Sequence, residues 1–191
     1  MPSLRCVKQK ARSIVIPDEH RAIRHEGWHR GQRGFSASPE ALAAANIHPS
    51  TGLATDYLNH FNEITMLIGL LPSMPEVLDD IRVWQPASYV EHFARSGFKE
   101  RALAISTYHE IPDPARDTFE TTIAAIDEAI LDAVARFETA PVSGYSLIAL
   151  EANAVLGPLM ARASGMIHGV EFDTDLFAPE TTQGTVDALL S

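Results

Sequence analysis

Cysteine and long apolar segments are the two features that this chain most clearly lacks. Cys6 is the only cysteine among 191 residues, so an internal disulfide cannot form. No run of 18 or more uncharged apolar residues occurs, which argues against a membrane-spanning helix. The basic first twelve residues are not followed by the apolar stretch of a secretory signal. We therefore expect no disulfide scaffold and no membrane contact, and we expect a cytoplasmic location.

The composition, with 46% hydrophobic and 21% charged residues, is typical of one globular domain at this length. Charge is unevenly distributed along it. Residues 1–36 hold 8 of the 15 Lys and Arg residues but only 3 acids, whereas the remaining chain holds 7 bases and 22 acids. This asymmetry predicts a separate basic arm. The arm has few aromatic residues and no signature of a nucleic-acid-binding fold, so we expect no nucleic-acid partner.

Helix start and stop signals recur from Ser38 onward, whereas strand signals are nearly absent. Ser38-Pro39-Glu40 has the form of a capped helix start. Between Leu53 and Leu71, apolar residues recur at intervals of three and four, and Pro72 follows, which predicts a core helix. Ser88-Tyr89-Val90-Glu91 is a capping-box pattern. Short helices are also expected after Pro75 and over residues 98–110.

Two further helices are predicted in the second half of the chain. Apolar residues spaced by three and four over 114–138 give the longest pattern. The segment from Gly144 to His168 is low in charge and rich in small residues, which allow a second helix to approach closely. We expect it to be a central helix or a subunit contact, with a homodimer through 144–167 as a hypothesis. The small residues are Ala149, Ala152, Gly157, Ala161, Ala163 and Gly165.

The fold class that these patterns predict is all-α. We expect an antiparallel bundle of five to seven helices over residues 37–169, because the predicted connections are short. Its two long helices, at 52–71 and 114–138, are expected to pack antiparallel. A flexible basic arm, 1–36, is expected before the bundle, and an acidic tail, 170–191, after it.

His25-Glu26-Gly27-Trp28-His29 has the H-E-x-x-H form and resembles the motif of zinc peptidases over five residues. On a helix, histidines four apart share one face and can bind one zinc ion, while the intervening glutamate can take a proton from the metal's water. Gly27 weakens the helix that this chemistry requires. The alternative interpretation is a basic, histidine-rich arm without a metal.

Asp56, His60 and Glu63 are spaced at i, i+4 and i+7 within the predicted core helix, which places them on nearby parts of its surface. This spacing resembles the ligand pattern of di-iron bundles, but those also need a Glu-x-x-His pair on a second helix. That second pair is missing here. A buried, hydrogen-bonded histidine flanked by carboxylates is the other interpretation.

The end of the chain reads Thr-Gln-Gly-Thr-Val-Asp-Ala-Leu-Leu over residues 182–190. It resembles the segment with which flagellar-switch and chemotaxis proteins bind a response-regulator receiver domain. The resemblance implies helix-in-groove recognition, and the implied partner-binding residues are Gln183, Val186, Asp187, Leu189 and Leu190. A terminal helical turn that packs on its own domain is the alternative.

The prediction for function is a non-enzymatic regulatory or adaptor protein whose partner is a protein, with a receiver domain as the candidate. No catalytic residue and no cofactor are predicted on this interpretation. A zinc hydrolase with Glu26 as general base is the first alternative, and a carboxylate-histidine redox bundle with iron is the second. Glycine-rich phosphate loops and paired C-x-x-C motifs are absent from the sequence, so nucleotide and thiol chemistry have no support.

Overall fold

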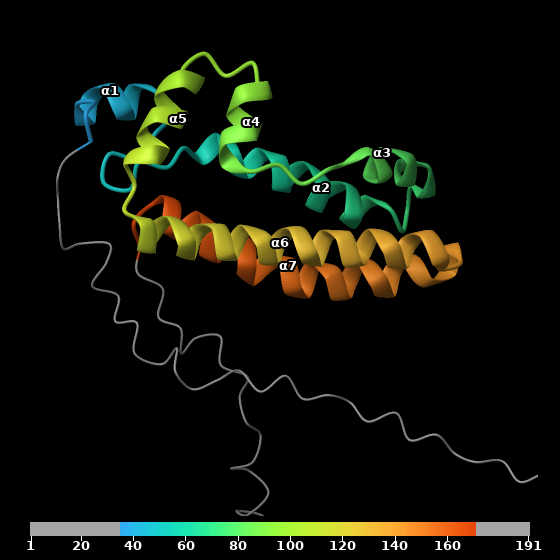
Figure 1. Cartoon of the computed structure of the whole chain (residues 1–191). Coiled ribbons are helices and arrows are strands. Elements are labelled where there is room, and N and C mark those ends of the chain that lie inside the picture. The colour runs from blue at the N-terminus through green and yellow to red at the C-terminus, as the bar shows by residue number, and fades with distance from the viewer. Residues whose placement is uncertain (1–34, 171–191) are drawn as a thin grey trace, which may run out of the picture.

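The computed structural model describes residues 35–170. Within this range the chain forms seven α-helices and no β-strand, which confirms the all-α class (Figure 1). The α-helices are α1 (Pro39–Ala44), α2 (Asn59–Leu70), α3 (Leu78–Val83), α4 (Tyr89–Arg95), α5 (Arg101–Glu110), α6 (Asp113–Thr139) and α7 (Tyr145–Ile167). Three short 3-10 helices join them, namely η3 (Thr55–Leu58), η4 (Pro75–Val77) and η5 (Val142–Gly144).

Two helix starts follow directly from capping residues. The Ser38 hydroxyl accepts a hydrogen bond from the backbone N–H of Ala41, and Pro39 is the first residue of α1. At α4, the Ser88 hydroxyl accepts from the N–H of Glu91, and the Glu91 carboxylate accepts from the N–H of Ser88. Each bond satisfies a backbone donor that has no partner inside the helix. Both predicted starts are confirmed.

The predicted core helix at 53–71 begins later than its sequence pattern indicates. Residues Thr55–Leu58 form the 3-10 helix η3, and the α-helix starts only at Asn59. Its apolar stripe is nevertheless buried as expected, because the tighter turn keeps the same side of the chain toward the core. The buried stripe consists of Leu53, Tyr57, Phe61, Ile64, Ile68 and Leu71.

Helices α6 and α7 form a long antiparallel hairpin that is the main support of the molecule (Figure 1). At its turn the ring of Phe137 meets that of Tyr145 edge to face, with centroids 5.3 Å apart. The stripe predicted for α6 is buried along its length, at Phe119, Ile123, Ile126, Ile130 and Phe137. Small residues of α7, including Ala149, Ala152 and Ala163, are buried on the inner side of that helix.

The expected antiparallel packing of the helices at 52–71 and 114–138 is wrong. Helix α2 runs in the same direction as α6, and α7 is the helix that runs opposite to both (Figure 1). The reason lies in the connection: α3, α4 and α5 carry the chain back to the starting end of α2 before α6 begins. Because α2 also packs on α7, the core is shared by these three helices.

Helices α4 and α5 lie together at the end of the molecule where α6 begins (Figure 1). The ring of Tyr89 on α4 stacks on that of Tyr108 on α5, with centroids 4.4 Å apart. At the same end the buried Thr51 hydroxyl donates to the carbonyl oxygen of Ile167 at 2.6 Å, which ties the loop before η3 to the last residue of α7. None of the helices in the described range is long and apolar enough to cross a membrane.

Candidate functional site: a cleft of tyrosines and carboxylates

A cleft of about 590 Å³ opens between η3, α4, the end of α5 and the first half of α6. Its volume lies within the range of small-molecule sites. Both aromatic rings and ionisable groups line the cleft, and such a combination can orient a bound ligand. The lining residues are Tyr57, Ser88, Tyr89, Val90, Tyr108, His109, Arg116, Phe119, Glu120, Ile123, Ala124 and Asp127.

Three tyrosines from three different elements form the aromatic wall of the cleft. Tyr57 of η3 lies 5.1 Å from Tyr89 of α4, between ring centroids, and Tyr89 stacks in turn on Tyr108 of α5. The ring of Phe119 on α6 lies 6.0 Å from that of Tyr57. Each ring packs against its neighbours, and the four residues are at most 5% exposed, so the wall is closely packed and leaves little free ring surface.

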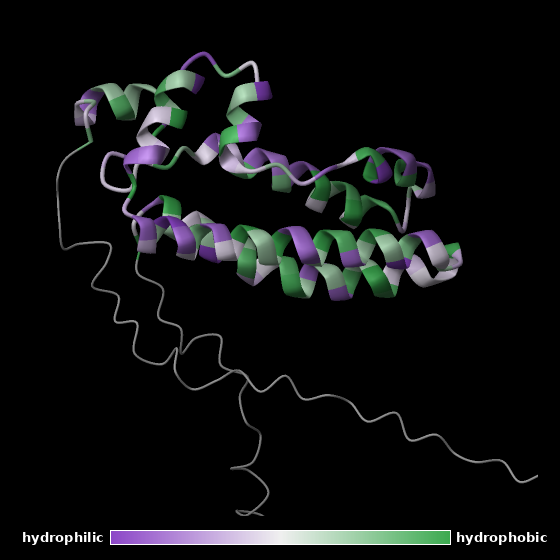
Figure 2. Ribbon diagram, viewed as in Figure 1, coloured by the Kyte–Doolittle hydropathy of each residue, from purple (hydrophilic) through white to green (hydrophobic). Residues whose placement is uncertain are grey.

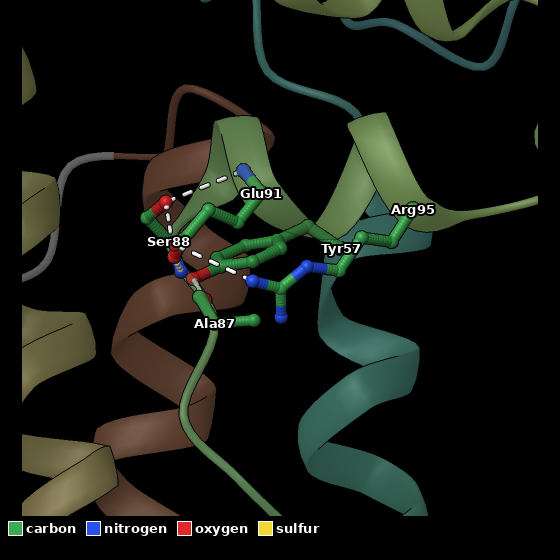
Figure 3. Close-up of polar contacts among 5 residues, drawn as sticks. All are labelled: Tyr57, Ala87, Ser88, Glu91 and Arg95. Atoms are coloured by element: carbon green, nitrogen blue, oxygen red, sulfur yellow. Dashed lines mark hydrogen bonds and ion pairs between the residues drawn. The ribbon is translucent and has the colours of Figure 1, made fainter.

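Hydrogen bonds fix the wall that α4 contributes (Figure 3). The Tyr57 hydroxyl donates to the carbonyl oxygen of Ala87 at 2.7 Å, immediately before the capping box formed by Ser88 and Glu91. A second carboxylate oxygen of Glu91 lies 3.6 Å from the Arg95 guanidinium, one turn further along α4. The Tyr89 hydroxyl accepts from the backbone N–H of Ala54 at 2.9 Å. Two of the three tyrosine hydroxyls are therefore occupied in holding the backbone.

Helix α6 provides the charged side of the cleft. Arg116, Glu120, Ile123 and Asp127 recur at intervals of four, three and four, so one side of the helix carries all of them. The Tyr108 hydroxyl donates to Oε1 of Glu120 at 2.6 Å, which joins α5 to α6 across the cleft. By contrast, Oδ1 of Asp127 is buried and has no hydrogen-bond partner within residues 35–170.

Burial sets the protonation states of these groups. It raises the pKa of Tyr57, Tyr89 and Tyr108 above the ordinary tyrosine value, which is already high enough to keep these hydroxyls neutral near pH 7. Burial also raises the pKa of the half-buried Asp127 carboxyl to about 6, because a charge is less well solvated there than in water. At neutral pH the carboxylate is the main form, and a cationic partner would stabilise it.

The arrangement is suited to recognising a positively charged organic group. Aromatic faces attract cations through their quadrupole, and an incompletely paired carboxylate adds a charge-assisted hydrogen bond. The one guanidinium of the lining opposes a cation less than its charge suggests. Arg116 is paired with the Asp113 carboxylate and also donates to the carbonyl oxygen of Ile111.

The structure does not test two of the three sites suggested by the sequence. His25, Glu26 and His29 lie outside the described residues, as do Gln183, Val186, Asp187, Leu189 and Leu190. The zinc motif and the tail segment therefore stay predictions.

The structure does describe Asp56, His60 and Glu63. Residues 35–170 contain no group of three His, Cys, Asp or Glu side chains placed to hold a metal ion. His60 instead stacks on Trp84 at 5.0 Å between centroids, and the Trp84 indole N–H donates to the His60 carbonyl oxygen at 3.2 Å. Burial lowers the pKa of His60, whereas the backbone of Gln85 and the nearby Glu63 act in the opposite direction. The carbonyl is satisfied, but Nε2 is buried without a partner among these residues.

Sequence reasoning missed the cleft altogether. One local signal was present, because Glu120 and Asp127 are seven residues apart on the side of α6 next to its apolar stripe. Nothing local, however, indicates that Tyr57, Tyr89 and Tyr108 meet those acids, since they come from elements separated by tens of residues.

Comparisons with known protein families, curated proteins and solved structures find no match for this chain. The interpretation of the cleft therefore depends on its own geometry and chemistry.

Proposed function

We propose that the protein is a binding protein that holds a small organic cation, such as an amine or a quaternary ammonium compound, in the cleft between α4, α5 and α6. One observation carries the proposal. Oδ1 of Asp127 is buried without a hydrogen-bond partner among residues 35–170, beside an aromatic wall, in a cleft large enough for a ligand. Buried polar groups are rarely left unpaired unless the site has a use for them.

The charges of the lining support this choice of ligand over an anion or a neutral apolar molecule. Within residues 35–170 the incompletely paired group of the lining is the Asp127 carboxylate, which is negative. An anion would meet the carboxylates of both Glu120 and Asp127, whereas the one guanidinium in the lining is already paired. A neutral apolar ligand would leave the Asp127 carboxylate without a partner, at a cost in free energy.

A direct test uses choline and its neutral isostere, in which a quaternary carbon replaces the nitrogen. The two molecules have nearly the same shape and differ in charge, so their comparison isolates the electrostatic part of binding. Isothermal titration calorimetry on the full chain should give a dissociation constant for choline between about 10 µM and 1 mM. The neutral isostere should bind at least about tenfold more weakly.

Two matched variants of α6 locate the site. Asp127→Asn removes the charge while keeping the shape of the side chain, and choline binding should weaken by about tenfold or more. Asp117→Asn makes the same chemical change at an exposed position of α6 outside the cleft lining, and affinity should stay unchanged. Equal affinity for choline and its isostere, or equal effects of the two variants, would contradict the proposal.

A second candidate function concerns the end of the chain. We propose that residues 182–190 bind a response-regulator receiver domain, because Val186, Leu189 and Leu190 fall at i, i+3 and i+4. Such spacing gives one helical turn with an apolar face. The notion of an adaptor protein rests on this segment and is independent of the cleft.

The tail is tested with a peptide of residues 180–191 and an isolated receiver domain. Ordering a short segment costs about 2–5 kcal/mol, so we expect a dissociation constant between about 1 µM and 1 mM. Replacing Leu189 and Leu190 by Ala should weaken binding by about tenfold or more. Thr185→Ala, at a position outside the apolar face, is the control. No binding by the unmodified peptide would remove the tail proposal and leave that for the cleft intact.

A further inference from the structure

The side of α7 that faces away from α2 and α6 is apolar, and no other part of residues 35–170 covers it. Leu147 is 60% exposed and Leu150 is 68% exposed, although both belong to a helix whose other side is buried. The exposed stripe continues through smaller residues to the end of the helix. Its members are Leu147, Leu150, Ala154, Gly157, Pro158 and Ala161, and Figure 2 shows apolar colouring recurring along α7.

Gly157 leaves open space on the exposed side of α7. Apart from its chain neighbours and the backbone of its own helix, a Cβ placed on it would meet nothing within 4 Å among the described residues. Pro158 follows it inside the helix, and a glycine before a proline avoids the clash between a Cβ and the proline ring. The glycine therefore has a local reason, and the space beside it allows a close approach of another helix.

The spacing of the stripe identifies what fits against it. Leu147, Leu150, Ala154, Gly157, Ala161 and Ser164 alternate in steps of three and four, which is the repeat of helices that pack along a shared seam. In an antiparallel pair of α7 helices, related by a twofold axis beside Val155 and Leu156, each larger residue meets a smaller one. The layers are Leu147 with Ser164, Leu150 with Ala161, and Ala154 with Gly157.

The charges of α7 fit the same arrangement. Glu151 and Arg162 are the only Asp, Glu, Lys or Arg residues of this helix. They are eleven residues apart, or about three turns, so they flank the stripe on one edge. The same twofold axis brings Glu151 of one copy within about 3 Å, along the helix axis, of Arg162 of the other. Glu151 is already paired with Arg136 of α6 in its own chain, so Arg162 of the second copy would join an existing ion pair on each side of the axis.

We propose that the exposed face of α7 binds a second copy of this chain, as an antiparallel helix pair centred between Ala154 and Gly157. The pairing of larger with smaller residues along the stripe and the position of Arg162 beside Glu151 of the other copy favour this occupant over an unrelated partner. The interface is isologous, because each copy presents the same surface. It lies on the opposite side of α7 from the described core and does not depend on the cleft.

Sedimentation velocity on the full chain tests the association. We expect a concentration-dependent dimer between about 1 and 200 µM. Ala154→Glu places a charge in the middle of the seam and should raise the dimer dissociation constant at least about tenfold. Val83→Glu is the matched control, because Val83 is 76% exposed but lies on α3. Circular dichroism should show that both variants keep their helices.

Cysteine pairing tests the register of the two helices. In a Cys6→Ser background, one sample carries Leu150→Cys and another carries Ala161→Cys. These two positions meet in the proposed pair, whereas two copies of either single variant place their cysteines about 16 Å apart along the helix axis. Mixing the samples should therefore give a disulfide-linked heterodimer at least about five times faster than either sample links to itself.

Three results would overturn the proposal. The first is a monomer for the unmodified chain at about 200 µM, which would assign the face to another occupant. A dimer that Ala154→Glu and Val83→Glu affect equally would place the interface elsewhere. Faster self-linking of either single-cysteine variant than cross-linking of the mixture would exclude the antiparallel register.

Discussion

The two halves of α6 have different roles. The second half contributes mainly to the stability of the fold, and the first half borders the proposed binding cleft. The second half packs against α7 through Ile130, Ala133 and Phe137, each at most 1% exposed. The first half borders the cleft and keeps polar groups there, with Glu120 bonded to Tyr108 and one oxygen of Asp127 without a partner among the described residues. The hairpin end is held by apolar contacts, whereas the cleft end combines buried aromatic rings with single, directional hydrogen bonds.

This contrast predicts which substitutions act on the free energy of unfolding and which act on ligand affinity. Apolar packing stabilises in proportion to the surface removed from water, so losses should be largest at the hairpin end. Polar groups that are positioned for a ligand often lower the stability of the ligand-free protein. Changes in the cleft should therefore have small effects on stability, and one of them should be favourable.

Phe137→Ala should have the largest effect. Phe137 is fully buried at the hairpin turn against Tyr145, and the substitution leaves a cavity as well as losing apolar burial. We expect the free energy of unfolding, measured by urea denaturation, to fall by about 3–5 kcal/mol. Val83→Ala, at an exposed position, should change it by less than about 0.5 kcal/mol. A loss below about 1 kcal/mol for Phe137→Ala would show that the hairpin is not the main support.

Thr51→Val should have the second largest effect, because it removes the bond between two distant parts of the chain. The Thr51 hydroxyl is buried and donates to the carbonyl oxygen of Ile167 at the end of α7. Valine has no hydroxyl, so this carbonyl oxygen would lose its hydrogen-bond donor. We expect a loss of about 1–3 kcal/mol in unfolding free energy. Thr121→Val is the control, since its exposed hydroxyl bonds only to the preceding turn of α6. Similar losses for both variants would contradict the assigned role of Thr51.

The hairpin end follows from the sequence because burial repeats with the helical period. The positions spaced by three and four in α6 are buried except Val134, which is partly buried, and Ser88 with Glu91 marks the start of α4 as predicted. Such signals act within a few residues, so a single sequence reveals them. The relative direction of α2 and α6 was mispredicted, since it depends on how α3, α4 and α5 return the chain.

The cleft could not be predicted because, like the relative direction of α2 and α6, it depends on how distant parts of the chain pack together. Tyr57, Tyr89 and Tyr108 become one wall only after three separate elements have packed together. Taken alone, each tyrosine has the sequence context of an ordinary core residue. The unpaired oxygen of Asp127 is likewise a property of the packed structure, because an aspartate on a helix is usually solvated.

Asp127→Asn should increase stability at neutral pH. The folded-state pKa of this carboxyl is about 6, above its ordinary value. As pH rises from about 4 to 6, the unfolded chain ionises first, so the folded protein loses stability over that window. Asparagine removes this loss, and we expect a gain of up to about 1 kcal/mol at pH 7.5, since the group is only half-buried and solvent screens its charge.

Urea denaturation at two pH values checks whether Asp127→Asn raises the free energy of unfolding as expected. The gain from Asp127→Asn should be present at about pH 7.5 and shrink at about pH 4.5. Asp117→Asn, on the exposed side of the same helix, should show no comparable change. If Asp127→Asn destabilised the protein at neutral pH, the carboxylate would have a stabilising partner, and the argument for a ligand cation would lose its basis.

Tyr108→Phe should have the smallest effect. It tests how much the hydrogen bond between Tyr108 and Glu120 contributes to the cleft wall. The substitution keeps the ring that stacks on Tyr89 but removes the hydroxyl that donates to Glu120. Because Glu120 is exposed, water can replace the lost donor, and we expect a loss of about 0.5 kcal/mol in unfolding free energy. Choline should bind about two- to threefold more weakly, since Glu120 is less firmly held. Tyr145→Phe, at the hairpin end, should leave choline affinity unchanged. A loss of binding as large as that of Asp127→Asn would instead make Glu120 the principal anion of the site.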